Sequence, residues 1–288
     1  MDKALIPIFY ATVAALCFGG QLVITLKSFS YVDPQTSSML TIGSCAAILW
    51  LLAPFLFKFR YLTNPGIWIF AANGLMHPLF SIYLAFEATK RMGATVSATI
   101  SATAPLFATA GAVFLLGEHI TLMLLLGTVG TVLGIMVLTW NRNGFRDWPL
   151  WAIMLPIGAA MIRAANHNLG KFGLDMLPSP YAAALVSFTV SLFGAVIINR
   201  LRLGRLPVPL PVRGLLWSGC AGALIAIGIL CMYTALHCGR VVVVSPIIAS
   251  FPLFTLLISL LFRQERFKLR ILLGVVLVIG GIVWICIQ

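Results

Sequence analysis

One segment of the chain occurs twice, and this internal repeat constrains the fold more than any other feature. Residues 94–140 align without a gap with residues 241–287, at a separation of 147 positions. The alignment pairs Pro105 with Pro252 and Glu118 with Glu265. Each copy contains two apolar runs joined by a short polar turn, with a proline inside the first run. Such a repeat indicates an architecture built from two similar halves.

The apolar runs are long enough to cross a lipid bilayer. Charged residues make up 9% of the chain, whereas they make up about a quarter of a soluble domain. A membrane-spanning helix needs about 20 apolar residues. We therefore predict an all-α membrane protein with ten transmembrane helices, at residues 5–26, 37–57, 67–88, 95–116, 121–140, 150–169, 181–198, 214–236, 241–262 and 269–287.

Ten spans in two copies predict two five-helix repeats. The first covers residues 1–140, a connecting loop covers 141–148, and the second repeat covers 149–288. Because five is odd, the second repeat must lie inverted relative to the first, and two inverted repeats can expose one central cavity to each side of the membrane in turn. Lys and Arg are more frequent after the odd-numbered spans, so the positive-inside rule places both termini outside the cytoplasm.

Two ionisable residues inside the apolar runs are candidates for a transport site. His77 lies at the centre of the third run, and Arg163 lies inside the sixth. A charge at this depth costs about 2.5–3.5 kcal/mol on insertion scales, so Arg163 should face water, a partner or an anionic substrate group. The structural alternative is a side chain that extends to the membrane interface.

Prolines inside the runs predict kinks, because proline removes a helical hydrogen bond. We expect Pro78, Pro105, Pro246 and Pro252 to act as hinges, and Pro156 to break the sixth run. In lipid, the carbonyl freed by each proline needs another partner, such as a neighbouring helix, water or a ligand. Glycines in the fifth and tenth runs instead predict close helix packing (Gly127, Gly130, Gly134, Gly274, Gly280, Gly281).

The acidic residues all fall at the ends of runs or between them, so a carboxylate proton relay is not expected. If protons are coupled to transport, His77 is the best candidate. Common hydrolase and nucleotide-binding motifs are missing, so we expect no enzyme, no cofactor and no metal site. The expected partners are a small-molecule substrate, protons in a coupled mechanism, and the lipid bilayer. We expect no nucleic acid, and the protein is predicted to be a monomer.

Several repeated motifs resemble a known family. Pro-Leu-Phe occurs at 105–107 and 252–254, Gly117-Glu118 has the counterpart Gln264-Glu265, and Leu-Leu-Gly follows each turn at 125–127 and 272–274. Together they resemble the drug/metabolite transporter superfamily, EamA type, although Gln264 stands where that family usually has glycine. The whole sequence is also similar to the YddG-type exporters of aromatic amino acids.

The resemblance implies secondary transport of a small metabolite in the bacterial inner membrane. It implies export of amino acids, including aromatic ones, by alternating access. Other substrates of the drug/metabolite transporter (DMT) superfamily remain open, either organic cations and drugs or anionic metabolites such as sugar phosphates. A channel or a membrane enzyme also remains an alternative function. The family's cavity-lining spans carry these candidate substrate-binding residues: Gln21, Asn73, His77, Tyr83, Ser101, Arg163, Asn166, Tyr233 and Ser245.

Overall fold

The computed structural model describes residues 5–92, 94–139, 149–203, 211–261 and 269–287, and the secondary structure of these residues is entirely helical. The helices are α1 (Leu5–Ser28), α2 (Pro34–Leu56), η1 (Phe59–Thr63), α3 (Gly66–Gly74), η2 (Leu75–Phe80), α4 (Ser81–Met92), α5 (Ala94–Ser101), α6 (Ala104–Leu116), α7 (Leu122–Thr139), η4 (Leu150–Ile153), α8 (Met154–Met176), α9 (Pro180–Leu203), α10 (Val212–Cys238), α11 (Val241–Ala249), α12 (Phe251–Leu261) and α13 (Leu269–Cys286). The predicted connecting loop 141–148, together with Gln264 and Glu265, lies outside the described residues.

Seven of the ten predicted runs coincide with helices that are long and apolar enough to cross a membrane. Within the described ranges these are Leu5–Ser28, Pro34–Leu56, Val96–Leu116, Leu122–Thr139, Pro180–Leu201, Val212–Cys238 and Val241–Leu261. The tenth run contains the shorter apolar helix Leu272–Cys286. The third run falls on α3, η2 and α4, and the sixth run falls on α8, which carries Arg163, Asn166 and His167.

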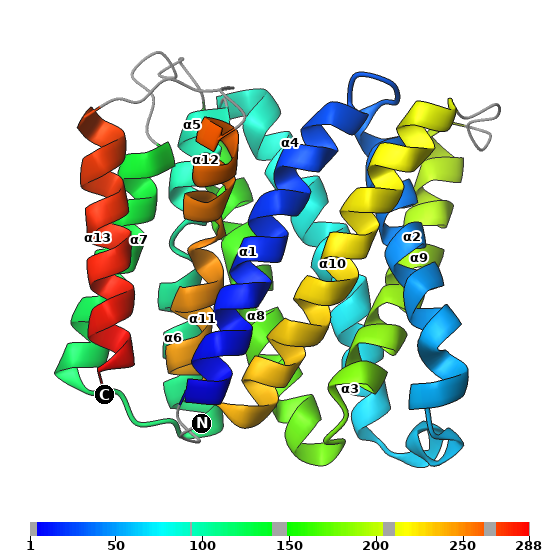
Figure 1. Ribbon diagram of the computed structural model, residues 1–288, viewed down its shortest axis with the longest axis horizontal. Coiled ribbons are helices and arrows are strands. Elements are labelled where there is room, and N and C mark those ends of the chain that lie inside the picture. Colours follow the sequence, from blue (N-terminus) through cyan, green and yellow to red (C-terminus); the bar gives the residue numbers. More distant parts are fainter. Residues whose placement is uncertain (1–4, 93, 140–148, 204–210, 262–268, 288) are drawn as a thin grey trace.

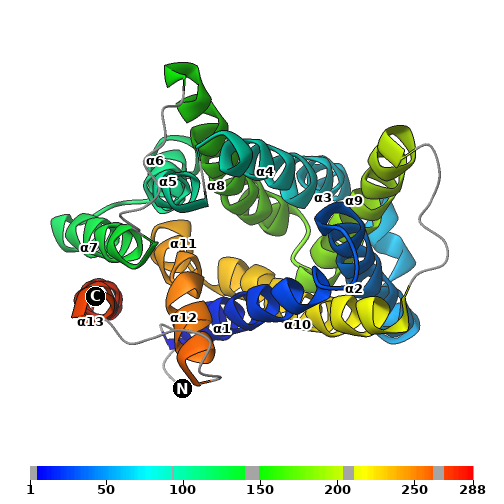
Figure 2. The same cartoon turned by 90° about the horizontal axis from the view of Figure 1, so that it is seen from above.

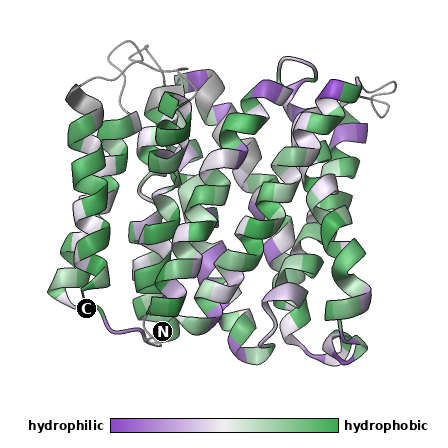
Figure 3. Cartoon of the chain, viewed as in Figure 1, coloured by the Kyte–Doolittle hydropathy of each residue, from purple (hydrophilic) through white to green (hydrophobic). Residues whose placement is uncertain are grey.

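The helices form one bundle with both termini at the same end (Figure 1). α1 runs from this end to the opposite end, and α13 runs back to it (Figure 1). Hydrophobic residues cover the length of the helices, and hydrophilic residues gather toward the two ends (Figure 3). Large apolar side chains point outward: Phe55, Phe114 and Leu201 are 84%, 85% and 80% exposed. An apolar outer surface of this kind suits lipid rather than water.

α7 and α13 pack against each other at one edge of the bundle (Figure 2). A Cβ atom added at Gly281 would lie 2.6 Å from the Gly127 carbonyl oxygen, and one at Gly134 would lie 2.6 Å from the Val278 nitrogen. No side chain larger than hydrogen fits at these contacts, so the predicted close packing is confirmed for Gly127, Gly134, Gly274 and Gly281. At Gly130 an added Cβ atom would make only an ordinary contact at 3.7 Å, and for Gly280 the prediction is wrong. Gly280 faces outward, and a Cβ atom there would meet nothing within 4 Å.

The predicted kinks occur at some prolines and not at others. The helix is interrupted between α5 and α6, directly before Pro105, and again between α11 and α12, directly before Pro252. Pro246 lies within α11, which continues to Ala249. The expectation that Pro156 breaks the sixth run is wrong, because Pro156 lies in the first turn of α8, where helical N–H groups have no intrahelical partner.

The third run changes its helical geometry beside the predicted hinge at Pro78. η2 is a π-helix, and inside it His77 has a non-helical backbone with φ −136° and ψ 129°. The residue before a proline is disfavoured in the α conformation, which explains this backbone locally. The break separates α3 from α4 and turns His77 out of a regular helical position.

Candidate functional site

A central cavity of about 420 Å³ lies between the helices. Its lining residues on α1 run from Phe18 to Thr25, in the second half of that helix, and continue at Phe29 just beyond it. Ser38, in the first turns of α2, also lines it. The cavity therefore extends from the middle of the bundle toward the end opposite the termini. Its volume is within the range of about 300–1,000 Å³ that is typical of small-molecule sites.

The structure brings most of the predicted site residues to this cavity. Gln21, His77, Arg163, Asn166, Tyr233, Ser245 and Pro105 line it. Asn73 and Ser101 are buried and are not among the lining residues. The backbone of Tyr83 lies in α4 and that of Pro78 in η2, but their side chains lie outside the described part of the structure. Pro246 and Pro252 are also absent from the lining.

Arg163 lines the cavity and has no partner in the part of the chain that the structure describes. The ion pairs among the described residues are Arg91–Glu87 and Lys171–Asp175, and Arg163 makes no hydrogen bond or ion pair with any described residue. Arg163 interacts electrostatically with His77 and His167, which line the same cavity. Among the described residues, therefore, nothing neutralises this charge, and water or a bound solute in the cavity can do so.

His167 lies one helical turn beyond Arg163 on α8 and links that helix to α11. Its Nδ1 lies 2.8 Å from the Ser245 hydroxyl oxygen. Residues four positions apart share a helix face, so the same face of α8 brings Arg163 and His167 to the cavity. The bond fixes the orientation of the imidazole and joins α8 to α11, the first helix of the interrupted ninth predicted run.

A hydrogen-bond network at Tyr233 connects α10 to three neighbouring helices. The Tyr233 hydroxyl lies 3.2 Å from the Ser187 hydroxyl of α9 and 3.5 Å from the Asn73 Nδ2 of α3. Asn73 also donates to the Asn166 carbonyl of α8 at 3.1 Å. Ser187 donates to the Phe70 carbonyl at 2.9 Å. Asn73 is thus a packing residue that holds the cavity wall together behind its surface.

His77 carries a buried polar atom whose hydrogen-bonding capacity no described residue uses. Its Nδ1 is buried and has no hydrogen-bond partner among the described residues. An unpartnered buried polar atom costs about 1–3 kcal/mol. Like the guanidinium of Arg163, this atom can form a hydrogen bond with water or a solute in the cavity.

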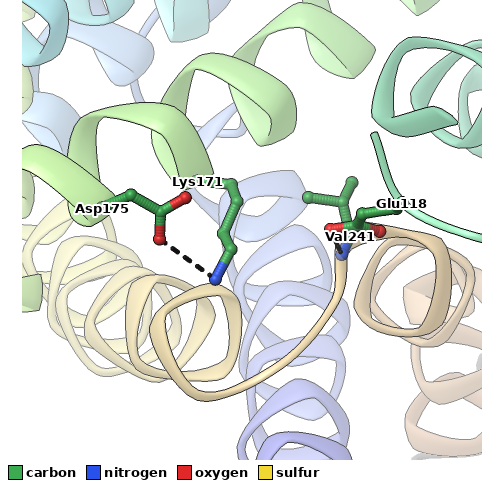
Figure 4. Close-up of polar contacts among 4 residues, drawn as sticks. All are labelled: Glu118, Lys171, Asp175 and Val241. Atoms are coloured by element: carbon green, nitrogen blue, oxygen red, sulfur yellow. Dashed lines mark hydrogen bonds and ion pairs between the residues drawn. The ribbon is translucent and has the colours of Figure 1, made fainter. Parts of the chain in front are cut away.

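The end of the bundle that carries the termini is held by a carboxylate contact between the two halves (Figure 4). Glu118 accepts hydrogen bonds from the backbone N–H groups of Val241 at 2.8 Å and Val242 at 2.9 Å. These are orphan donors at the start of α11, and a carboxylate there also complements the helix dipole. Gly117 makes the turn possible with a left-handed backbone at φ 67°. In the same region Lys171 and Asp175 pair on the last turns of α8 (Figure 4).

The comparisons with known proteins agree with this architecture. The model of the EamA-like transporter family matches residues 5–140 and again residues 150–287. The chain belongs to the EamA-like transporter family. No curated protein matches the sequence significantly. A solved crystal structure resembles this EamA-like protein with a TM-score of 0.82 and 16% sequence identity, over 96% of this chain and 95% of the other. At that identity the likeness concerns the fold.

Membership fixes the general character of the protein. EamA-like proteins are transporters and not enzymes, so this chain is a multi-pass integral membrane protein with lipid around it and a small-molecule substrate. The two matched segments correspond to the internal repeat seen in the sequence.

Sequence reasoning did not include His167 among the candidate residues of the cavity, and it assigned no role to Glu118 at the other end of the bundle. His167 was one of three polar residues after Arg163, and its spacing of four from Arg163 was the signal that both face one cavity. The role of Glu118 at the start of α11 had no such signal. It depends on the packing of one half of the chain against the other, and 123 residues separate the two partners.

Proposed function

We propose that this EamA-like transporter exports amino acids, including aromatic ones, or similar small metabolites across the bacterial inner membrane by alternating access. The observation that carries the proposal is the Arg163 guanidinium, which lines a largely apolar cavity and has no hydrogen-bond or ion-pair partner among the described residues. An α-carboxylate matches the planar fork of a guanidinium through paired hydrogen bonds. The apolar lining, which includes Phe18, Phe188 and Phe251, suits a large apolar side chain.

In this proposal the chain crosses the membrane ten times as two inverted five-helix repeats. The three predicted runs beyond the seven long apolar helices are those on α3–η2–α4, α8 and α13. The first two carry part of the polar lining of the cavity, including His77, Arg163 and His167, which lowers their hydropathy for a functional reason. The opposite course of α1 and α13, with both termini at one end, supports an even number of crossings (Figure 1).

The end of the bundle toward which the cavity extends is the loading side of the proposed exporter. The distribution of Lys and Arg assigns the end opposite the termini to the cytoplasm. The cavity extends toward that end, and the Glu118 contact holds the other end together. This arrangement suits a state that takes up substrate from the cytoplasm. Hinges before Pro105 and Pro252 would let the half-helices move when the cavity changes sides.

A carrier of organic cations is less well supported. Such a substrate needs a carboxylate in the cavity, and no Asp or Glu is among its described lining residues. Proton coupling, if present, would act through the imidazole of His77, which lies beside Arg163 and the cavity.

The experiment is flux through the purified protein in liposomes. We expect the transporter to move labelled phenylalanine, and Arg163→Gln to abolish this flux. Arg213→Gln is the matched control, because Arg213 is exposed at the start of α10, away from the cavity lining. Absence of flux for every amino acid tested would refute the proposal. A parallel measurement with and without a pH gradient, in the unsubstituted protein and in His77→Ala, tests proton coupling.

A further inference from the structure

The polar side of the cavity has one electrostatic sign. Its lining includes Arg163, His77 and His167. The guanidinium of Arg163 interacts electrostatically with the imidazoles of both histidines. Arg163 is charged at any physiological pH, because the guanidinium of a free arginine loses its proton only far above that range. The field in this part of the cavity is therefore positive whichever protonation state the two imidazoles adopt.

Each described carboxylate is engaged away from this cluster. Asp33 accepts the Thr36 N–H at the start of α2, Glu87 pairs with Arg91, Glu118 caps α11, and Asp175 pairs with Lys171. None of these four is a lining residue of the cavity. The described lining therefore offers a carboxylate ligand a countercharge and offers an ammonium group only neutral acceptors.

The two charged ends of an amino acid would meet very different surroundings here. The carboxylate would exchange water for the Arg163 fork, and charge-assisted hydrogen bonds of this kind are about twice as strong as neutral ones. The ammonium group would lose water near like charges, and a buried charge without a partner is strongly disfavoured. The neutral acceptors available to it include Gln21, whose Nε2 already donates to Thr25 Oγ1 at 2.7 Å and whose carbonyl oxygen remains.

We infer that the cavity recognises its ligand through the carboxylate alone. The ligand class is an aromatic or branched aliphatic monocarboxylate, and the α-ammonium group of an amino acid is tolerated and not selected. A deaminated acid therefore binds at least as tightly as the corresponding amino acid. The inference rests on the proposed function, since it assumes that the transported solute occupies this cavity, and it narrows the recognised group to one end of that solute.

Three ligands with the same benzyl group test the inference on the unsubstituted protein. Phenylalanine carries both charges, 3-phenylpropionate only the carboxylate, and 2-phenylethylamine only the ammonium. Each competes with uptake of labelled phenylalanine into proteoliposomes, and each is titrated into the detergent-purified protein by calorimetry. The calorimetric measurement is independent of any passage of the acid or amine through the bilayer.

We expect 3-phenylpropionate to inhibit uptake of labelled phenylalanine at the same concentration as unlabelled phenylalanine or at a lower one. At these concentrations 2-phenylethylamine should not inhibit uptake. In Arg163→Gln, binding of 3-phenylpropionate should weaken about 30-fold or more, as expected when one partner of a desolvated charge pair is removed. Arg163→Lys keeps the charge and loses the planar fork, so it should retain part of the affinity. Arg213→Gln should bind all three ligands as the unsubstituted protein does.

The outcomes separate this inference from the proposed function. If phenylalanine is transported and 3-phenylpropionate competes less well than either phenylalanine or 2-phenylethylamine, the inference is overturned and amino-acid transport stands. If neither phenylalanine nor 3-phenylpropionate is bound or moved, the proposed function itself fails. Should Arg163→Gln fail to fold, the ranking of the three ligands on the unsubstituted protein still decides the question.

Discussion

Glu118 joins the two halves of the transporter, and its hydrogen bonds give a quantitative prediction for Glu118→Ala. The carboxylate accepts the Val241 N–H at 2.8 Å and the Val242 N–H at 2.9 Å. Hydrogen bonds to charged groups contribute about 1.5–3 kcal/mol each, whereas the loss of a helix cap costs about 0.5–2 kcal/mol because water can replace it. Glu118 is half-buried, so water replaces it incompletely. We expect the substitution to lower the free energy of unfolding by about 2 kcal/mol.

Thermal unfolding of the purified protein in detergent, followed by tryptophan fluorescence, measures this change. In domains of about 150–250 residues, each kcal/mol shifts Tm by about 2–4 °C. The expected decrease for Glu118→Ala is therefore about 4 °C or more. Glu118→Gln keeps one acceptor oxygen and loses the charge, so its Tm should lie between those of Glu118→Ala and the unsubstituted protein.

The neighbouring residue supplies the control. His119 has an exposed side chain, and its part in the contact is made by the backbone carbonyl, which accepts a hydrogen bond from Arg240 Nη1 at 3.3 Å. His119→Ala keeps that carbonyl and should leave Tm unchanged. If Glu118→Ala also unfolds within about 1 °C of the unsubstituted protein, the carboxylate contributes nothing to the closed end and the reasoning is refuted.

Three further predictions concern packing, charge and the cavity. Gly281→Ala should lower Tm, because its Cβ would lie 2.6 Å from the Gly127 carbonyl oxygen and overpacking costs about 1–3 kcal/mol, whereas Gly280→Ala, which meets nothing within 4 Å, should leave Tm equal or raise it. Partial burial alone would raise the pKa of Asp33, but hydrogen bonds from backbone N–H groups, including that of Thr36 at 2.9 Å, outweigh it and lower that pKa below its ordinary value of 3.8. The ionised Asp33 therefore stabilises the fold above pH 3.8, and this stabilisation is lost as the pH falls from 3.8 toward the lowered pKa. Asp33→Asn should flatten that part of a plot of Tm against pH. Arg163→Met should leave Tm equal or raise it while abolishing phenylalanine flux, and a lower Tm would show that Arg163 stabilises the fold instead.

Much of the fold could be predicted from the sequence because the repeat carries it. A separation of 147 residues predicts that a helix starting at Ala94 has a counterpart starting at Val241, and α5 and α11 begin at these residues. The interruptions before Pro105 and Pro252 follow from the chemistry of proline, which acts within a single turn. Length and hydropathy likewise locate the long apolar helices, since both are local properties of the chain.

The site was less predictable because it depends on which way each helix faces. Asn73 lies four residues before His77 and would share its face in a regular helix. The π-helix and the non-helical backbone at His77 interrupt that periodicity, so Asn73 turns toward Tyr233 while His77 reaches the cavity. The bond between His167 and Ser245 joins residues 78 positions apart. No local pattern predicts such a contact, because it arises only when two distant helices pack.

The charge of Arg163 links the stability of the fold to its function. An arginine at the centre of a span costs about 2.5–3.5 kcal/mol on insertion scales, and a fold normally offsets that cost with an internal partner. The described structure contains four carboxylates, each engaged elsewhere, and Arg163 has a cavity in place of a partner. The free energy that an internal ion pair would release during folding is thus still available when an anion binds. A cavity of this kind favours solutes that bring the missing charge with them, which is why the carboxylate is the group that we expect to decide what this transporter carries.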